Sequence, residues 1–115
     1  MRYAINSVRV MPIPEILTPE RERLFFLELE ECTQSDRPCL VLDCSKAGGL
    51  GASVIYLLLR SLEEAMKRNG DARLAAVSSD GRAALEAAGA SRLFRIFDSE
   101  AEAVGSFHRP TADAA

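Results

Sequence analysis

Apolar residues recur in two different periods along this chain, and the order of the two periods predicts alternating strands and helices. Leu40–Leu42 form a continuous apolar run between Pro38 and Asp43, which is typical of a short strand buried on both faces. The turn Lys46–Gly51 follows, and its glycines can adopt the positive φ angles that tight reversals need. After this turn the pattern changes to a helical period.

A long amphipathic helix is predicted next, with Ser53 near its start and Asn69-Gly70 as its stop. Its apolar side comprises Val54, Ile55, Leu57, Leu58, Leu59, Leu62, Ala65 and Met66. Its polar side offers two ion pairs at i,i+4 spacing, Glu63 with Lys67 and Glu64 with Arg68. The stretch from the strand to the end of this helix is therefore where we look first for function.

Before this stretch, two short β-type runs, Arg2–Ile5 and Val8–Met11, are separated by Asn6-Ser7 and predict a hairpin at the sheet edge. Thr18 is a candidate N-cap for a helix over Pro19–Cys32. The core side of that helix passes through Phe25, Leu29 and Cys32, with Leu24 and Phe26 at its flanks. Leu27 falls on the charged side, where we expect it to be exposed; an interface role for it is the less favoured interpretation.

Three further elements follow the long helix. Arg73–Val77 is predicted as a strand, Ser79-Asp80 as the cap of a helix ending at Gly89, and Leu93–Phe97 as a short strand. Asp98 or Ser99 is expected to cap a final helix. The helix over 79–89 is expected to bury Ala84, Leu85 and Ala88, and the final helix Ala103, Val104 and Phe107.

This order predicts an α/β fold: a small mixed, mainly parallel sheet with about four helices. Residues 1–107 are expected to form one domain and residues 108–115 a flexible C-terminal tail. The expected core comprises Leu40, Leu42, Ile55, Leu58, Leu62, Leu74, Val77, Leu85 and Phe94.

Composition narrows the function classes. Fourteen basic and seventeen acidic residues give a net charge of −3, so the electrostatic footprint of a nucleic-acid-binding protein is missing. No apolar run is long enough for a membrane span, and Pro12 and Pro14 interrupt the region where a signal peptide would be apolar. Cys32, Cys39 and Cys44 fit buried thiols in a reducing compartment. A cytoplasmic protein is the expectation.

The sequence offers few residues that could carry out enzyme chemistry. The glycine turn, with Gly48, Gly49 and Gly51, could hold an anion at a helix start, but the lysine of a phosphate-binding P-loop is missing and a plain tight turn is favoured. Cys44 lies beside Asp43, yet His108 is the single histidine and offers no evident base. We expect no catalytic residues, no cofactor and no metal site.

A series of short signatures resembles the STAS domain, the fold of bacterial anti-sigma-factor antagonists. The similarity extends over about Val8 to Phe107 with no gap after Pro38. Its signatures are Leu42-Asp43-Cys44-Ser45, Asn69-Gly70-Asp71, Val77-Ser78, Leu85-Glu86-Ala87-Ala88-Gly89 and the run from Leu93 to Ala103. The resemblance implies a non-enzymatic module that binds a serine-kinase anti-sigma factor or a related signalling partner in transcription regulation, with a homodimer also open.

Family members that act as phosphorylation switches carry Asp-Ser-Ser-Gly or Asp-Ser-Thr-Gly at the start of the long helix. In the ungapped register Gly51-Ala52-Ser53-Val54 stands there, so Ser53 aligns with the phosphoacceptor while Gly51 and Val54 depart from the motif. A register that instead matches Gly49-Leu50-Gly51 to the family's Gly-Leu-Gly would leave no hydroxyl and is second. A serine that only caps the helix is the plain alternative for Ser53.

The resemblance thus implies a partner-binding surface made of Gly48, Gly49, Gly51, Ala52, Ser53 and Val54. Because Val54 is β-branched, we expect it to crowd Ser53 and make that serine less accessible. The alternative function is a non-phosphorylated STAS sensor, scaffold or transport-accessory domain that binds a nucleotide, lipid or other small anion at the glycine turn.

Overall fold

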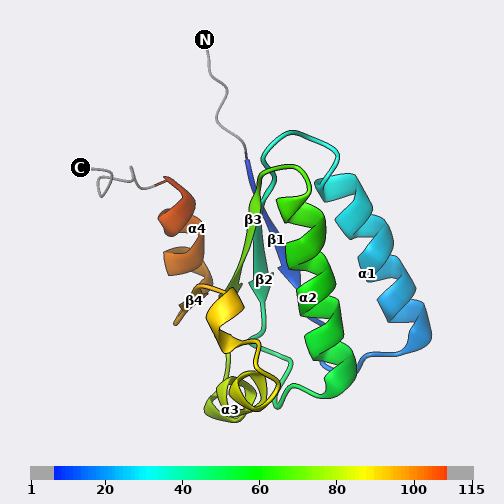
Figure 1. Ribbon diagram of the computed structural model, residues 1–115. Helices are drawn as coiled ribbons and strands as arrows, with labels where there is room; N and C mark the ends of the chain where they lie inside the picture. The colour runs from blue at the N-terminus through cyan, green and yellow to red at the C-terminus, as the bar shows by residue number, and fades with distance from the viewer. Residues whose placement is uncertain (1–6, 109–115) are drawn as a thin grey trace.

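The computed structural model describes residues 7–108 as four strands, four helices and one 3-10 turn (Figure 1). In chain order the elements are β1 (Val8–Pro12), α1 (Pro19–Cys32), β2 (Cys39–Asp43), α2 (Ala52–Met66), β3 (Asp71–Ala75), α3 (Ser79–Ala87), η1 (Ser91–Leu93), β4 (Ile96–Phe97) and α4 (Glu100–His108). The predicted α/β fold is confirmed. The predicted hairpin partner over 2–5 lies outside the described residues.

The sheet has the order β1-β2-β3-β4, and each neighbouring pair is parallel. β2 lies in its interior, with Val10 opposite Val41 on one side and Arg73 opposite Val41 on the other. Leu40, Val41 and Leu42 are fully buried, because helices cover both faces of a parallel sheet. The continuous apolar run in the sequence therefore gave the correct strand.

Alternate residues of β2 point into two separate clusters. Leu40 and Leu42 belong to the larger cluster, which α1 and α2 cover, whereas Val41 belongs to a smaller one with Ala75 and Ala103. Figure 1 shows α1 and α2 together on one side of the sheet and α4 on the other. Every residue of the expected core is buried.

The first helix follows its sequence pattern closely. The Thr18 hydroxyl oxygen accepts a hydrogen bond from the Arg21 N–H at 3.1 Å and caps α1 as predicted. Phe25, Leu29 and Cys32 are buried, and Leu27 is 56% exposed, as expected. Leu24, predicted at the flank of the core, is 55% exposed. The outer side of α1 thus presents two leucines to solvent.

Two predictions for the long helix are wrong. Met66 was assigned to the apolar side but is 59% exposed, because α2 ends there. The expected ion pairs also differ: Glu64 lies 3.7 Å from Arg60 and 3.1 Å from Lys67. Arg68 instead donates a hydrogen bond to the Gln34 carbonyl at 2.8 Å, since the residues beyond Met66 no longer follow the helix and turn toward the α1–β2 loop.

Both strand predictions after α2 have the wrong bounds, and β3 starts at Asp71, two residues before the predicted strand 73–77. β3 ends at Ala75, because Ala76 takes a left-handed conformation with φ 58° and leaves the sheet. Within the predicted strand 93–97 only Ile96–Phe97 pair, since Leu93 ends η1 and is 56% exposed. Phe94 is 7% exposed and fills the main core instead.

Two helix caps and one helix end refine the remaining predictions. Ser78, not Ser79 or Asp80, caps α3, and the Ser99 hydroxyl oxygen accepts from the Glu102 N–H at 3.1 Å at the start of α4. His108 is the last residue of α4, so the helix includes the first residue of the predicted tail. Leu85 and Ala103 are fully buried as expected, whereas Ala88, expected to be buried, is exposed.

Arg73 fastens α4 to the sheet. Its guanidinium lies 3.8 Å from the centre of the Phe107 ring and donates to the Ser106 hydroxyl at 2.6 Å. A second guanidinium nitrogen lies 2.9 Å from the Asp71 carboxylate. The arginine thus joins β3 to the last turn of α4 by a charge–aromatic contact and a hydrogen bond.

Two glycines give a matched test of the packing. A Cβ on Gly70 would overlap the Pro38 carbonyl oxygen, whereas a Cβ on Gly105 would meet nothing within 4 Å. We expect Gly70→Ala to lower the free energy of unfolding by about 3 kcal/mol or more. Gly105→Ala, inside α4, should raise it by about 0.5–1 kcal/mol. Urea unfolding measures both, and equal effects would contradict the described approach of Pro38 to Gly70.

Candidate functional site

The loop from β2 to α2 leaves the sheet where two neighbouring strands hold its first residues. The Asp43 carbonyl accepts from the Ile13 N–H at 2.9 Å, and the Cys44 N–H donates to the Ala75 carbonyl at 2.9 Å. One Asp43 carboxylate oxygen accepts from the Ser45 N–H at 3.0 Å, which turns the chain away from the sheet. The start of the loop is therefore fixed by the sheet itself.

Only one of the three loop glycines uses a backbone conformation that favours glycine. Gly48 has φ 64°, whereas Gly51 has φ −77° and Gly49 is not among the positive-φ residues. Successive N–H groups in alternating left- and right-handed conformations are needed to build an anion-binding nest. A tight turn, the interpretation favoured from the sequence, agrees with this geometry.

Ser78 ties the loop to the start of α3. Its hydroxyl donates to the Gly48 carbonyl at 3.0 Å and accepts from the Gly81 N–H at 3.0 Å. Gly81 is required at this contact, because a Cβ there would lie 2.9 Å from Val77 Cγ1 and 3.1 Å from Leu50 Cγ. The sequence showed Ser78 as the end of a signature, but no local pattern could show its reach to Gly48.

Ser53 lies in the first turn of α2, where it does not serve as a cap. The N-cap is Gly51, which has no side chain to accept a hydrogen bond. Among the described residues, nothing pairs with the Ser53 hydroxyl, and Ser53 is exposed. The first N–H groups of a helix have no acceptor inside the helix, so the start of α2 presents free donors beside an accessible hydroxyl.

The prediction that Val54 would hide Ser53 is wrong. Val54 is half-buried and packs against the main core cluster, so its branched side chain points inward rather than over the serine. Gly48, Gly49, Gly51 and Ala52 are exposed like Ser53. The predicted partner-binding residues therefore form one exposed surface at the start of α2, and Val54 packs beneath it against the core.

An apolar groove continues from this edge between α2 and α3. It has a volume of about 490 Å³ and includes Tyr56, which is 51% exposed. Its lining residues are Leu50, Ala52, Ile55, Tyr56, Leu59, Ala84, Ala87 and Ala88. Sequence reasoning missed this surface, because α3 contributes only alanines to it.

A second apolar groove begins at Leu59, which the two grooves share, and continues toward η1. It has a volume of about 510 Å³, and Met66 and Leu93 are its most exposed apolar residues. Glu63 and Lys67 lie at its border. One continuous apolar strip thus follows α2 from the glycine turn to the last helical turn.

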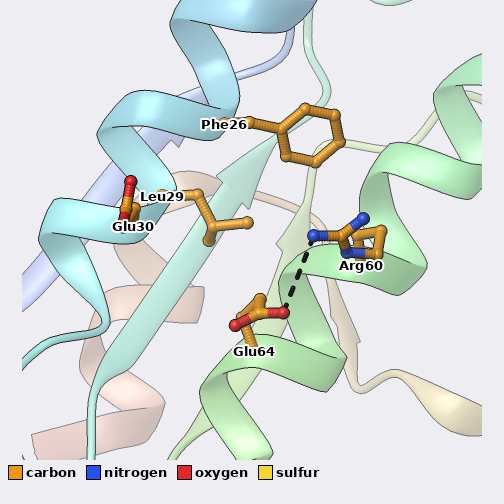
Figure 2. A pocket seen from close by; sticks show the side chains of 5 residues that line it. All are labelled: Phe26, Leu29, Glu30, Arg60 and Glu64. Carbon is orange, nitrogen blue, oxygen red and sulfur yellow. Dashed lines mark ion pairs between the residues drawn. The ribbon is translucent and has the colours of Figure 1, made fainter.

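The pocket between α1 and α2 is closed by an arginine (Figure 2). Arg60 donates to the Tyr56 hydroxyl oxygen at 3.2 Å, lies 5.2 Å from the centre of the Phe26 ring and 3.7 Å from Glu64. The hydrogen bond to Tyr56 raises the pKa of Arg60. These partners occupy the guanidinium of Arg60. Arg60 therefore links α1 to α2 across a pocket of about 280 Å³ and does not offer a free positive charge to a ligand.

Cys44 is not built as a nucleophile. The side chain is 2% exposed, and burial, followed by the nearby Asp43 charge, raises the pKa of its thiol to about 12. A thiol with this pKa carries almost no thiolate near neutral pH. Cys32 and Cys44 are buried and Cys39 is half-buried, all three as free thiols.

Among residues 7–108, no group of three histidine, cysteine, aspartate or glutamate side chains is arranged to hold a metal ion. None of the helices in the same range combines the length and the apolar character that crossing a membrane requires.

The comparison with protein families decides the identity of the fold. The model of the STAS domain matches residues 2–103. This chain belongs to the STAS domain family. No curated protein matches it in sequence.

Solved structures agree with the STAS fold. The chain is 18% identical to an anti-sigma-factor antagonist (STAS) domain protein from Planctomyces limnophilus, with a TM-score of 0.73 over 87% of this chain and 90% of that chain. It is 17% identical to a sulfate transporter family protein from Wolinella succinogenes, with a TM-score of 0.71 over 93% of this chain and 89% of that chain. At these identities the likeness concerns the fold.

The departures of this STAS domain from the switch motif now have a structural meaning. In the ungapped register, Gly51 takes the place of the motif's aspartate, and α2 has no side-chain cap. In the same register Val54 takes the place of the motif's glycine, and it adds a core contact beneath the helix start. The start of α2 thus has an exposed hydroxyl at Ser53 and no carboxylate at position 51.

The buried thiol predicts a pH dependence. The pKa of Cys44 is about 12 in the folded state and near 8.5 in the unfolded state. The stability that the buried, protonated thiol contributes is therefore complete below about pH 8.5 and is lost as the pH rises toward 12. The unfolded state releases the proton first, so stability falls with rising pH. We expect this loss to reach about 5 kcal/mol. Urea unfolding of Cys44→Ala between pH 8 and 11 should show a shallower fall than the wild type; equal slopes would contradict the assignment.

Proposed function

We propose that this STAS domain is a non-enzymatic regulatory module that binds a serine-kinase anti-sigma factor, or a related signalling protein, and is switched by phosphorylation of Ser53. The observation that carries the proposal is the exposed, uncapped start of α2 directly beside an apolar groove. The similarity of fold to an anti-sigma-factor antagonist supports the same class of partner. A cytoplasmic setting in transcription regulation is part of the proposal.

The groove supplies the apolar part of such a contact. Protein interfaces combine a buried apolar centre with a polar rim, and tyrosine is enriched at their centres. Tyr56 and Leu59 lie in the groove one and two turns beyond Ser53. A partner that covers the groove would therefore also cover the hydroxyl.

Phosphorylation would change this surface by charge. A phosphoserine adds about −1.5 to −2 charges at neutral pH, and the free N–H groups at the start of α2 can stabilise them. The folded state then tolerates the phosphate, whereas a partner surface that accepted a neutral hydroxyl is repelled. Binding is lost without unfolding.

A serine pair tests the switch. With a serine-kinase anti-sigma factor as the binding partner, we expect Ser53→Asp to weaken binding at least tenfold, about 1.4 kcal/mol, and to leave the melting temperature within about 2 °C. Ser53→Ala should bind but resist phosphorylation in a kinase assay with ATP. Ser45→Ala is the matched control, because Ser45 is an exposed serine of the same loop whose backbone bond to Asp43 survives.

The outcome that contradicts the switch is equal labelling of the wild type and Ser53→Ala. Binding of both Ser53 variants at wild-type affinity would assign a constitutive interaction module instead. A Tyr56→Ser change separates the groove from the serine: we expect weaker binding with unchanged phosphorylation.

A second candidate is a small-anion sensor, in a transport-accessory or scaffold setting. The free N–H groups at the start of α2 favour it, and the fold similarity to a sulfate transporter family protein agrees with it. The single positive φ at Gly48 and the missing loop lysine make it the weaker candidate. A rise in melting temperature with nucleotides, phospholipids or sulfate, absent in Ser53→Asp, would support it.

A further inference from the structure

The outer side of α1 has an apolar seam that no other described element covers. Leu24 and Leu27 are 55% and 56% exposed on the helix surface opposite Phe25 and Leu29. Figure 1 shows α1 at the outer border of the helix layer, with α2 and the sheet on its inner side. Glu20, Leu24, Leu27 and Glu31 follow one another at spacings of four, three and four residues, which is the spacing of a coiled-coil contact line.

The charges beside this seam are arranged in a particular order. Arg21 and Glu28 lie two turns apart on one flank, and Arg23 and Glu30 lie two turns apart on the other. All four side chains belong to exposed residues. On each flank the positive charge is near the helix start and the negative charge near its end.

The acidic end of α1 opposes the helix dipole. Negative charges in the last turn of a helix are unfavourable by a few tenths of a kcal/mol each, and α1 has Glu30 and Glu31 there with no basic residue, whereas Glu20 and Glu22 in its first turn are favourable. Among residues 7–108, no charged side chain of α1 takes part in an ion pair. Arg21 donates to the Ile16 carbonyl at 3.1 Å and keeps further N–H groups free.

We propose that this seam is the contact surface of a homodimer in which α1 pairs with α1 of a second copy in antiparallel orientation. A two-fold axis between Leu24 and Leu27 places each leucine against the other in the partner. It also brings the same flanks of the two helices together, so Arg21 meets Glu28 and Arg23 meets Glu30, each pair twice. The chain is thus complementary to itself.

A parallel pair fits less well. In a parallel pair, a residue on one flank of the first helix meets the residue five positions later on the other flank of the second helix. This arrangement pairs Arg23 with Glu28 but leaves Arg21 and Glu30 without opposite charges. Antiparallel pairing also sets the two helix dipoles in opposition, which is favourable. One antiparallel contact is unfavourable, because Glu20 meets Glu31 of the second copy at each end of the seam.

The dimer is expected to be weak. A helix of 14 residues is roughly 21 Å long, and one such pair buries less than the roughly 1,200 Å² of a standard interface. We expect a dissociation constant on the order of 100 µM at low salt, rising with ionic strength. The surface is separate from Ser53 and the α2–α3 groove, so the dimer goes beyond the proposed partner binding and does not depend on it.

Sedimentation velocity from about 10 µM to 1 mM measures the association, and two leucines give a matched pair of variants. Leu27→Asn should abolish the dimer, whereas Leu93→Asn, which changes a leucine with the same 56% exposure, should leave it intact. A monomer at 1 mM, or a dimer lost only in Leu93→Asn, overturns the proposal. Far-UV circular dichroism on the same samples shows that both variants remain folded.

Charge changes test the orientation. Glu30→Arg alone should weaken the dimer about tenfold, because it places an arginine opposite Arg23 of the second copy where an opposite charge stood. Adding Arg23→Glu should restore the dimer. Glu31→Gln should tighten it severalfold by removing the repulsion from Glu20. Failure of the double reversal to restore association, or weaker association in Glu31→Gln, overturns the antiparallel register.

Discussion

The backbone pairing at the carboxyl end of β2 is the constraint on which the rest of this STAS domain depends. Ile13 donates to Asp43 from one side, and Cys44 donates to Ala75 from the other. These two bonds fix the point where the chain leaves a strand whose Leu40–Leu42 are fully buried. The glycine turn can be exposed and still be well placed, because its first residues cannot move without breaking pairing on both sides of the sheet.

The position of Ser53 follows from this constraint through a second contact. The turn reaches α2 after passing Gly48, whose carbonyl is held by Ser78, and Gly81 leaves just enough room for Leu50 beneath it. The loop is therefore fastened at its start by the sheet and in its middle by α3. The exposed serine, the groove and the first turn of α2 therefore lie on a surface whose loop is held at two points, and a surface held in this way loses less conformational entropy in a contact than a mobile loop does.

Most of the fold could be predicted from the sequence because its signals are local. Thr18, the left-handed Asn69 at the end of α2 and the 40–42 run each act on neighbouring residues, and the periods of α1 and α2 report which side is buried. The errors occurred where distant contacts decide. Phe94 leaves the predicted strand to fill the core, and Arg68 turns to Gln34 rather than to Glu64.

The candidate site was predictable only in part for the same reason. The resemblance placed Ser53 at the helix start, but the exposure of its hydroxyl depends on Val54 turning inward. The α2–α3 groove is made by alanines of α3 that carry no sequence signal of their own. Ser78 caps α3 and also holds the Gly48 carbonyl; the cap was predicted at Ser79-Asp80, and no local pattern indicates the contact with Gly48.

The contacts of Arg73 with Phe107 and Ser106 have a practical consequence for handling the protein. They hold the end of α4 against the sheet face opposite α1 and α2. A label, surface tether or fusion partner attached beyond His108 would thus begin on the reverse side of the molecule from both the α2 groove and the α1 seam. Immobilisation through that end leaves the two candidate contact surfaces open to solution.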